Sequence, residues 1–255
     1  MALDSFIAKN LNPDEAYLRL YRWEPYCISL GANQNINSIN IQKAKEDNID
    51  VVFRPTGGRA ILHSEELTYS VIIPINTTVS AKEIYRNINL ALAEGLKKYD
   101  EMLNLIELET LQPNFSHLYK EEKSTLCFSV PAKSELKFNG KKLAGSAQRK
   151  LNNSLLQHGS ILCGTYHNKI VKYLNMNENN IREIENDIYE TTIELNTILR
   201  KEIDYTRMAY SIRNGFSSFF NCIFEEIDLE SLLTRTGFSN QDIFKAELLT
   251  MKENL

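Results

Sequence analysis

Apolar and polar positions alternate along the first part of the chain, as is typical of β-strands. In AYLRLYRW (16–23), Leu18 and Leu20 fall on one face of an extended chain, and the polar and aromatic residues between them fall on the other. Four later segments are also expected to be strands, namely YCISLG (26–31), DVVFR (50–54), AILH (60–63) and LTYSVIIPI (67–75). The polar stretch NIQKAKEDN (40–48) predicts a short helix between the second and third of these five strands.

Helical spacing replaces this alternation further along the chain. Ser80 and Glu83 form a capping box, and apolar residues then recur at helical spacing from Ile84 to Leu96, which predicts a helix over 81–99. Tyr205, Met208, Ala209, Ile212 and Phe216 have the spacing of an amphipathic helix. Two more helices are expected over 228–238 and 240–255.

A β-hairpin is predicted in the middle of the chain, where Asn139-Gly140 is a pair favoured by type I′ turns. A two-residue loop would pair Phe138 with Lys141, Lys137 with Lys142, and Leu136 with Leu143. Because paired side chains share a face, Lys142 would then leave the face of the apolar residues. With the strand LLQHGSIL (155–162), residues 126–163 predict an antiparallel meander, preceded by a polar loop over 112–125.

Strands come first in this order and helices come last. The fold class expected is therefore α+β, a mainly antiparallel sheet with flanking helices. We expect a single domain over 1–255, whose C-terminal segment is helical from about residue 166.

The charge and composition of the chain limit the classes of partner that it is expected to bind. The chain has 255 residues and a net charge of −4, so no global basic field indicates binding to nucleic acid or a membrane. No apolar run approaches the roughly 18 residues of a membrane helix. The first residues, MALDSFIAKN, lack the apolar core of a secretory signal, and the expected location is the cytoplasm.

The stretch FRPTGGRAILH (53–63) has two interpretations. Its Pro and glycines are typical of a tight turn between two strands. Its exposed backbone N–H groups could instead hold an acyl carbonyl, a phosphate or a carboxylate, with Arg54 and Arg59 either adding charge or solvating the surface. The patterns GxxxxGK[ST] and GxGxxG are absent, so the usual nucleotide fingerprints do not apply.

The four cysteines are far apart and form no CxxC pair, which argues against a metal site and a redox pair. The simplest expectation for most of them is a small buried hydrophobe. Cys127 could however act as a nucleophile, with the ammonium of Lys142 favouring its thiolate. His63 and His158 are candidates for acid/base catalysis, or are hydrogen-bonded structural histidines.

Three motifs together carry a family resemblance: FRPTGGRAILHSEELTYSVIIP, CFSVPAKSELKFNGKKLAGSAQ and LLQHGSIL, in this order and spacing. The chain resembles the biotin/lipoate protein ligase and lipoyl/octanoyltransferase superfamily over nearly its whole length. It is most similar to the cysteine-dependent octanoyltransferases of Gram-positive type. The resemblance implies that superfamily's catalytic-domain fold.

The resemblance also implies roles for individual residues. Cys127 would carry the acyl group as a thioester, and Lys142 would support the thiolate and the carbonyl oxygen. The residues expected to contact the substrate are Arg54, Thr56, Gly57, Gly58, Arg59, His63, Gly145, Ser146, Ala147, His158 and Gly159. Ala132 and Ser134 depart from the family pattern, in which a Ser and an aromatic residue are expected; this affects the substrate assignment more than the catalytic one.

The partners implied are an octanoyl-acyl carrier protein as donor and a lysine of a lipoyl domain, such as glycine cleavage H protein, as acceptor. No cofactor or metal would be required. An alternative is a ligase that uses ATP and Mg²⁺ to activate a free acid. Two others are an amidotransferase between lipoyl domains and a catalytically silent module that binds acylated carriers.

Overall fold

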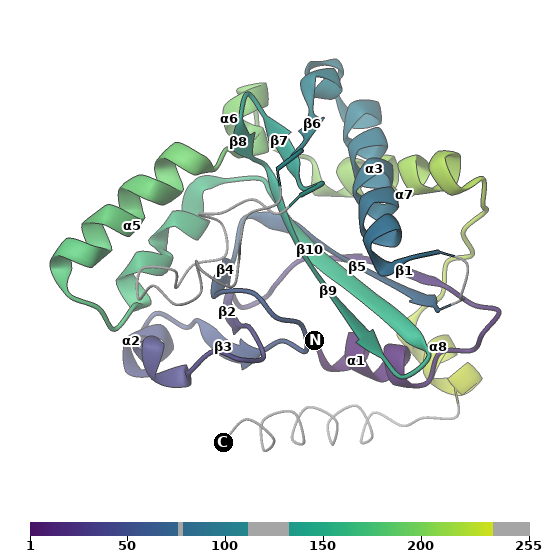
Figure 1. Cartoon of the computed structure of the whole chain (residues 1–255), viewed down its shortest axis with the longest axis horizontal. Helices are drawn as coiled ribbons and strands as arrows, with labels where there is room; N and C mark the ends of the chain where they lie inside the picture. The colour runs from purple at the N-terminus through teal and green to yellow at the C-terminus, as the bar shows by residue number, and fades with distance from the viewer. Residues whose placement is uncertain (76–78, 112–132, 237–255) are drawn as a thin grey trace.

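The largest sheet has four antiparallel strands in the order β1-β5-β10-β9 (Figure 1). Its strands are β1 (Tyr17–Tyr21), β5 (Glu66–Pro74), β10 (Ser154–Leu162) and β9 (Ala144–Leu151). The structure is a computed structural model that describes residues 1–75, 79–111 and 133–236. The alternation in β1 is confirmed, because Leu18 and Leu20 pack against the main apolar core while Arg19 and Tyr21 contact the buried Asp4.

Two long helices cover one face of this sheet. They are α3 (Ala81–Tyr99) and α7 (Tyr205–Phe220), and they lie side by side (Figure 1). Both were expected from apolar spacing, and the predicted bounds 81–99 are those of α3. The Ser80 side chain accepts a hydrogen bond from the Glu83 N–H at the start of α3, as a capping residue does. Met208, Ile212 and Phe216 of α7 are buried in the shared core.

A second, three-stranded sheet stands on the other side of the molecule, in the order β3-β2-β4. Its strands are β2 (Cys27–Leu30), β3 (Asp50–Phe53) and β4 (Ile61–His63), and β2 runs parallel to β3 but antiparallel to β4. Three helical elements pack near it, namely α2 (Ile41–Glu46), the 3-10 helix η3 (Thr165–Tyr173) and α5 (Glu178–Thr191). The expectation of an α+β fold with mainly antiparallel strands is confirmed.

The predicted hairpin is present in a third, small sheet. Its strands are β6 (Glu107–Leu108), β7 (Leu136–Phe138) and β8 (Lys141–Lys142). The expected register is confirmed, since Lys137 pairs with Lys142 and Phe138 with Lys141. Asn139 and Gly140 both have positive φ, 49° and 78°, as a type I′ turn requires.

The predicted meander over 126–163 is wrong, because the chain changes sheets after the hairpin. The N–H of Leu143 donates to the Leu136 carbonyl in β7, and the Leu143 carbonyl accepts from the Leu162 N–H in β10. Leu143 is fully buried. Its N–H and its carbonyl are each hydrogen-bonded to a different sheet, so the change of sheets leaves neither backbone group without a partner. The predicted loop over 112–125 and the strand around Cys127 lie outside the described residues.

The remaining elements are short or were not expected. The helix α1 (Ala2–Lys9) was not predicted; its Phe6 and Ile7 pack on the sheet face opposite to α3, against Ile72 and Leu156. The others are η1 (Ile36–Ser38), η2 (Glu101–Leu105), α6 (Leu195–Leu199) and α8 (Leu229–Thr236). The helix α8 corresponds to the helix predicted over 228–238, whereas 240–255 lies outside the described residues.

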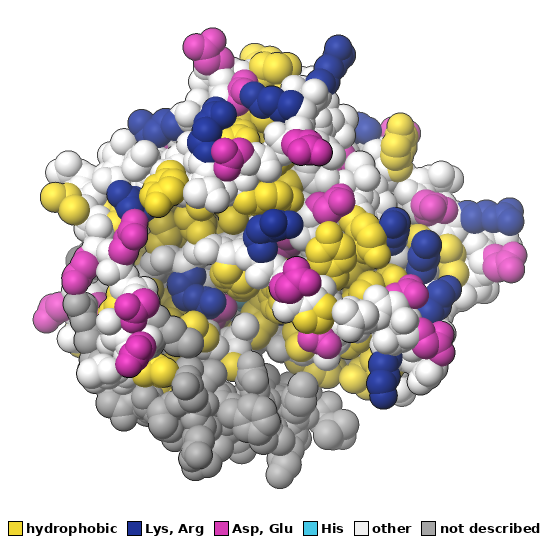
Figure 2. All heavy atoms as spheres, turned by 180° about the vertical axis from the view of Figure 1, so that it is seen from behind, with side chains coloured by type: hydrophobic (Ala, Val, Ile, Leu, Met, Phe, Trp, Pro, Cys, Tyr) yellow, Lys and Arg dark blue, Asp and Glu magenta, His cyan; other side chains and the backbone are white. Residues whose placement is uncertain are grey.

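The surface carries charges of both signs. On the face shown in Figure 2, Lys and Arg side chains are interspersed with Asp and Glu, and hydrophobic side chains reach the surface between them. Among the helices of the described ranges, none combines the length and the hydropathy needed to cross a bilayer.

Candidate functional site

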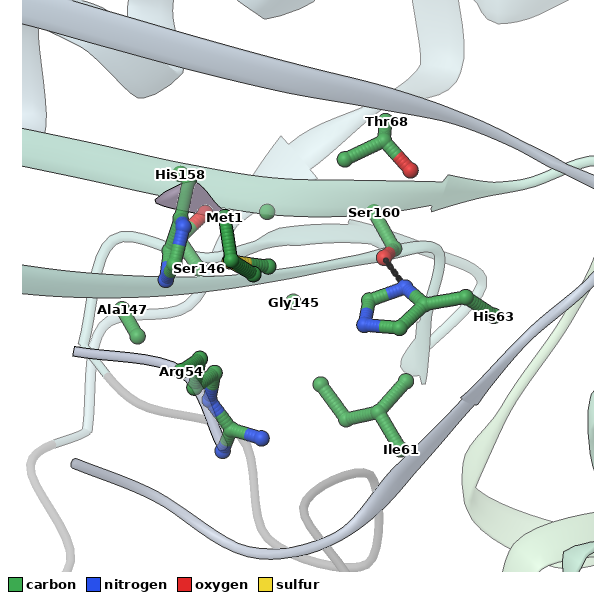
Figure 3. Close-up of a pocket in the computed structure, with 11 residues that line it drawn as sticks. Met1, Arg54, Ile61, His63, Thr68, Gly145, Ser146, Ala147, His158 and Ser160 are labelled. Carbon is green, nitrogen blue, oxygen red and sulfur yellow. Dashed lines mark hydrogen bonds between the residues drawn. The ribbon is translucent and has the colours of Figure 1, made fainter. Parts of the chain in front are cut away.

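A cavity lies between the large sheet and the turn that joins β3 to β4. The enclosed space that a water molecule could occupy is about 20 Å³, within a wider hollow of about 320 Å³ that includes open solvent. Arg54, Ile61 and His63 line one side, and residues of β5, β9 and β10 line the other (Figure 3). The lining residues are Met1, Arg54, Ile61, His63, Thr68, Gly145, Ser146, Ala147, His158, Gly159 and Ser160. Seven of the residues expected to contact substrate are therefore brought together, although they come from distant parts of the sequence.

Arg54 is buried and holds the turn in place. Its guanidinium donates to the Gly57 carbonyl at 3.2 Å, the Arg59 carbonyl at 2.6 Å and the Ser29 carbonyl at 2.9 Å. The side chain is only 2% exposed, so the interpretation that Arg54 solvates the surface is wrong. The rigid fork of a guanidinium suits this bridging of several carbonyls.

Four of the residues expected to contact substrate lie outside the lining of this cavity. Thr56 contacts a lining residue, with its Oγ1 atom 2.7 Å from Nε2 of His158. Gly57 is exposed, and Gly58 has a φ of 99°, which a turn accommodates best with glycine. Arg59 is half-buried and supplies its carbonyl to Arg54. In this structure these four residues belong to the turn itself.

His63 is hydrogen-bonded through both ring nitrogens. Nε2 lies 2.7 Å from Ser29 Oγ, and Nδ1 lies 2.7 Å from Glu66 Oε1. The same carboxylate oxygen accepts the hydroxyls of Thr68 and Ser160. Burial raises the pKa of Glu66, but the charge of His63 and these donors outweigh it, so the net pKa is lowered. His63 is therefore a structural histidine with both ring nitrogens hydrogen-bonded, and its ring also lines the cavity.

His158 is different, because only one of its nitrogens is satisfied. Nε2 faces Thr56, whereas Nδ1 has no hydrogen-bond partner among the described residues. Burial lowers the pKa of His158 to about 3, an effect that Asp4 partly opposes. The imidazole is therefore neutral at physiological pH and offers the cavity an uncharged ring.

The low pKa of His158 predicts a loss of stability in acid. His158 binds a proton near pH 6.5 in the unfolded chain but only near pH 3 in the folded chain. The contribution of neutral His158 to the free energy of unfolding is therefore fully present above pH 6.5 and is lost as the pH falls toward 3. We expect wild type to lose about 2 kcal/mol from this residue between pH 7 and 5. Urea unfolding of His158→Gln at both pH values checks this, because the variant should lose that much less. An equal loss in both proteins would contradict the assignment.

Lys142 lies at a second centre, next to the cavity. Its Nζ is 2.8 Å from Oε2 of Glu135, and Oε1 of Glu135 accepts the Ser146 N–H at 3.0 Å. Lys142 is 2% exposed, so it is a buried charge and not a solvated lysine at the tip of the hairpin. Its expected catalytic partner Cys127 lies outside the described residues, as does Ala132. Glu135 was not among the expected site residues, although it lies directly before the hairpin and within the motif CFSVPAKSELKFNGKKLAGSAQ.

The remaining chemistry of the described residues is limited. Cys27 and Cys163 are buried, and burial raises the pKa of both thiols to about 12, which confirms the expectation of small hydrophobes. Cys222 is half-buried. Within 1–75, 79–111 and 133–236, no group of three His, Cys, Asp or Glu side chains is arranged to hold a metal ion.

The chain is similar in sequence to proteins of one known family. Residues 1–217 match the family model of the lipoyl protein ligase A/B catalytic domain. The chain is 34% identical over 232 residues to octanoyltransferase LipM of Exiguobacterium sp., which covers 89% of this chain and 84% of that protein. It is 35% identical over 247 residues to octanoyltransferase LipM of Clostridioides difficile, which covers 90% and 85%.

Solved structures share the fold. The bipartite lipoate protein ligase of Thermoplasma acidophilum has a TM-score of 0.72 at 18% identity, with 98% of this chain and 86% of that chain covered. A lipoate-protein ligase A bound with ATP has a TM-score of 0.71 at 19% identity, covering 98% and 88%. At these identities the likeness concerns the fold alone.

Proposed function

Because the chain belongs to the family of the lipoyl protein ligase A/B catalytic domain and is an acyltransferase, we propose that it moves an octanoyl group onto a lysine of a lipoyl domain. The donor is octanoyl-acyl carrier protein, and glycine cleavage H protein is a suitable acceptor. The observation that carries the proposal is the buried Lys142 beside the strand that lines the cavity, in a chain similar to octanoyltransferase LipM.

The reaction proceeds in two balanced steps. The Cys127 thiol first gives up its proton, the thiolate attacks the thioester carbonyl of the donor, the carbon–sulfur bond of the donor breaks, and the carrier leaves as a thiolate that takes up a proton in turn. The uncharged amine of the acceptor lysine then attacks the acyl-enzyme, forms an amide and releases the Cys127 thiol. The Lys142 ammonium favours the thiolate and stabilises the negative carbonyl oxygen in both steps. A thioester is exchanged for an amide, so neither ATP nor a metal is required.

The cavity provides the place for the acyl chain. Gly145, Ala147 and Gly159 have small side chains or none, and Ile61 adds an apolar wall. The ring of His158 is neutral, so it adds no buried charge next to the chain. Each methylene buried there contributes about 0.8 kcal/mol, which favours medium chains over short ones. The turn on the other side of the cavity is shaped by five residues, namely Arg54, Thr56, Gly57, Gly58 and Arg59.

The proposal predicts that the purified protein becomes acylated without ATP. Incubation with octanoyl carrier protein should add the mass of one octanoyl group to the intact protein, and addition of a lipoyl domain should move that mass to the acceptor. Cys127→Ser should gain no such mass under the same conditions. Mass spectrometry of the intact proteins measures both steps.

Three outcomes would each replace this proposal with another. Modification of the acceptor from free octanoate, only in the presence of ATP, would identify a ligase. Transfer from an octanoylated lipoyl domain but not from the carrier protein would identify an amidotransferase. Binding of the acylated carrier without any transfer would leave only a binding module.

A further inference from the structure

We propose that Glu135 is a positioning residue for the Lys142 ammonium, whose carboxylate fixes this charge relative to the strand that lines the cavity. The inference rests on the proposed function, because it concerns the lysine that acts in both acyl-transfer steps. It gives a role to a residue that lies within the motif CFSVPAKSELKFNGKKLAGSAQ but was not among the expected site residues.

The Glu135 carboxylate is held at both oxygens. Oε2 lies 2.8 Å from Lys142 Nζ, and Oε1 accepts the Ser146 N–H at 3.0 Å. The carboxylate is 3% exposed and the lysine side chain 2%, so water screens their attraction weakly. Two fixed contacts leave the carboxylate little freedom to follow the lysine elsewhere.

Ser146 is itself anchored to the core, which makes it a rigid reference point. Its hydroxyl lies 2.6 Å from the Tyr69 hydroxyl and donates to Asn89 Oδ1 at 3.1 Å, and its carbonyl accepts from the Tyr85 hydroxyl at 3.2 Å. Because β9 is at the edge of its sheet, the Ser146 N–H points out of the sheet, toward Glu135. Glu135 thereby connects Lys142 to the strand that places Gly145 and Ala147 in the cavity (Figure 3).

The stability of the fold does not explain why a buried ion pair such as Lys142–Glu135 is present. Removing two charges from water costs about as much as their attraction returns, and apolar side chains of similar size usually stabilise a buried position as well or better. A charge held at a defined point is what the reaction requires, because misplacement of a catalytic group by about 1 Å can slow a reaction about a hundredfold.

Single-turnover acylation by octanoyl carrier protein tests the inference. Glu135→Gln keeps the size and can still accept from the Ser146 N–H, but it loses the charge. We expect its acylation rate to fall about 10-fold to 100-fold, with the KM for the carrier protein within about twofold of wild type. Glu135→Asp, which restores the charge on a shorter stem, should recover part of the loss.

A double-variant comparison separates positioning from a structural role. If Glu135 acts through Lys142, adding Glu135→Gln to Lys142→Gln should slow the reaction no further. Glu109→Gln is the matched control, because the Glu109 carboxylate pairs with Lys137, a different lysine of the same small sheet, at 2.9 Å. That variant should keep the wild-type rate.

The outcomes are distinct. A wild-type rate in Glu135→Gln, or equal losses in Glu135→Gln and Glu109→Gln, would overturn the positioning role while leaving octanoyl transfer intact. A further loss in the double variant would do the same. If wild type itself is not acylated, the proposed function fails instead, and this is seen before any variant is compared.

Discussion

Replacing Lys142 with methionine is expected to slow octanoyl transfer by about 100-fold to 1,000-fold and to lower the free energy of unfolding by about 3–5 kcal/mol. Methionine is close to lysine in length but carries no charge, so it can neither favour the Cys127 thiolate nor stabilise the carbonyl oxygen. It also leaves the buried Glu135 carboxylate without the ammonium 2.8 Å away. Acyl transfer followed by mass spectrometry and urea unfolding measure the two effects.

Second variants separate these two effects. Lys142→Met with Glu135→Gln removes both charges, so it should regain most of the stability but none of the activity. Lys137→Met is the control, because that lysine pairs with Glu109 and is 21% exposed. It should cost about 1 kcal/mol or less and keep the transfer activity. Substantial octanoyl transfer by Lys142→Met would contradict the role given to this ammonium.

The hairpin around Lys142 shows which structural features the local sequence can predict and which it cannot. The Asn139-Gly140 pair fixes a two-residue turn, and the turn fixes the register, so the pairing of Lys142 with Lys137 could be predicted. The contact with Glu135 could not, because it depends on how the chain leaves the hairpin at Leu143 and enters another sheet. The meander prediction failed at the same residue, since no local signal marks a change of sheet.

The turn after β3 shows a different limit. Its Pro and glycines predict a turn, and the structure has one, but composition could not say which way Arg54 points. Its burial depends on β2, which supplies the Ser29 carbonyl about two dozen positions earlier in the chain. Five of the expected substrate residues lie on the neighbouring strands β9 and β10, whereas Arg54 and His63 reach the same cavity from the other sheet, and this meeting comes from tertiary packing.

Helices could be predicted where the apolar period was long. The 19-residue helix α3 carries both a cap and a regular apolar stripe, and its bounds match. The helix α1 has only eight residues and no side-chain cap, so packing on the sheet rather than its own sequence determines it. The spacing of apolar residues shows which face of a helix is buried. It does not show how closely that helix approaches its neighbour.

The close approach of α3 and α7 gives the second large effect: Gly95→Ala is expected to destabilise the protein by about 3 kcal/mol. In an ordinary helix this change stabilises by about 1 kcal/mol. Here a Cβ at Gly95 would lie 2.5 Å from the Cα of Ile212 and 3.0 Å from the Ser211 carbonyl oxygen. Backbone atoms cannot rotate away, so the two helices must separate and lose packing between them.

The opposite side of the crossing is equally tight, which allows an independent check. A Cβ at Gly215 would lie 2.2 Å from the Gly95 nitrogen, so Gly215→Ala should destabilise by a similar amount. Lys97→Ala is the control, because that residue is exposed on the same helix and should change stability by less than about 0.5 kcal/mol. Urea midpoints at constant m-value compare the variants. An increase in stability for Gly95→Ala would mean that helix propensity prevails and that the two backbones do not touch there.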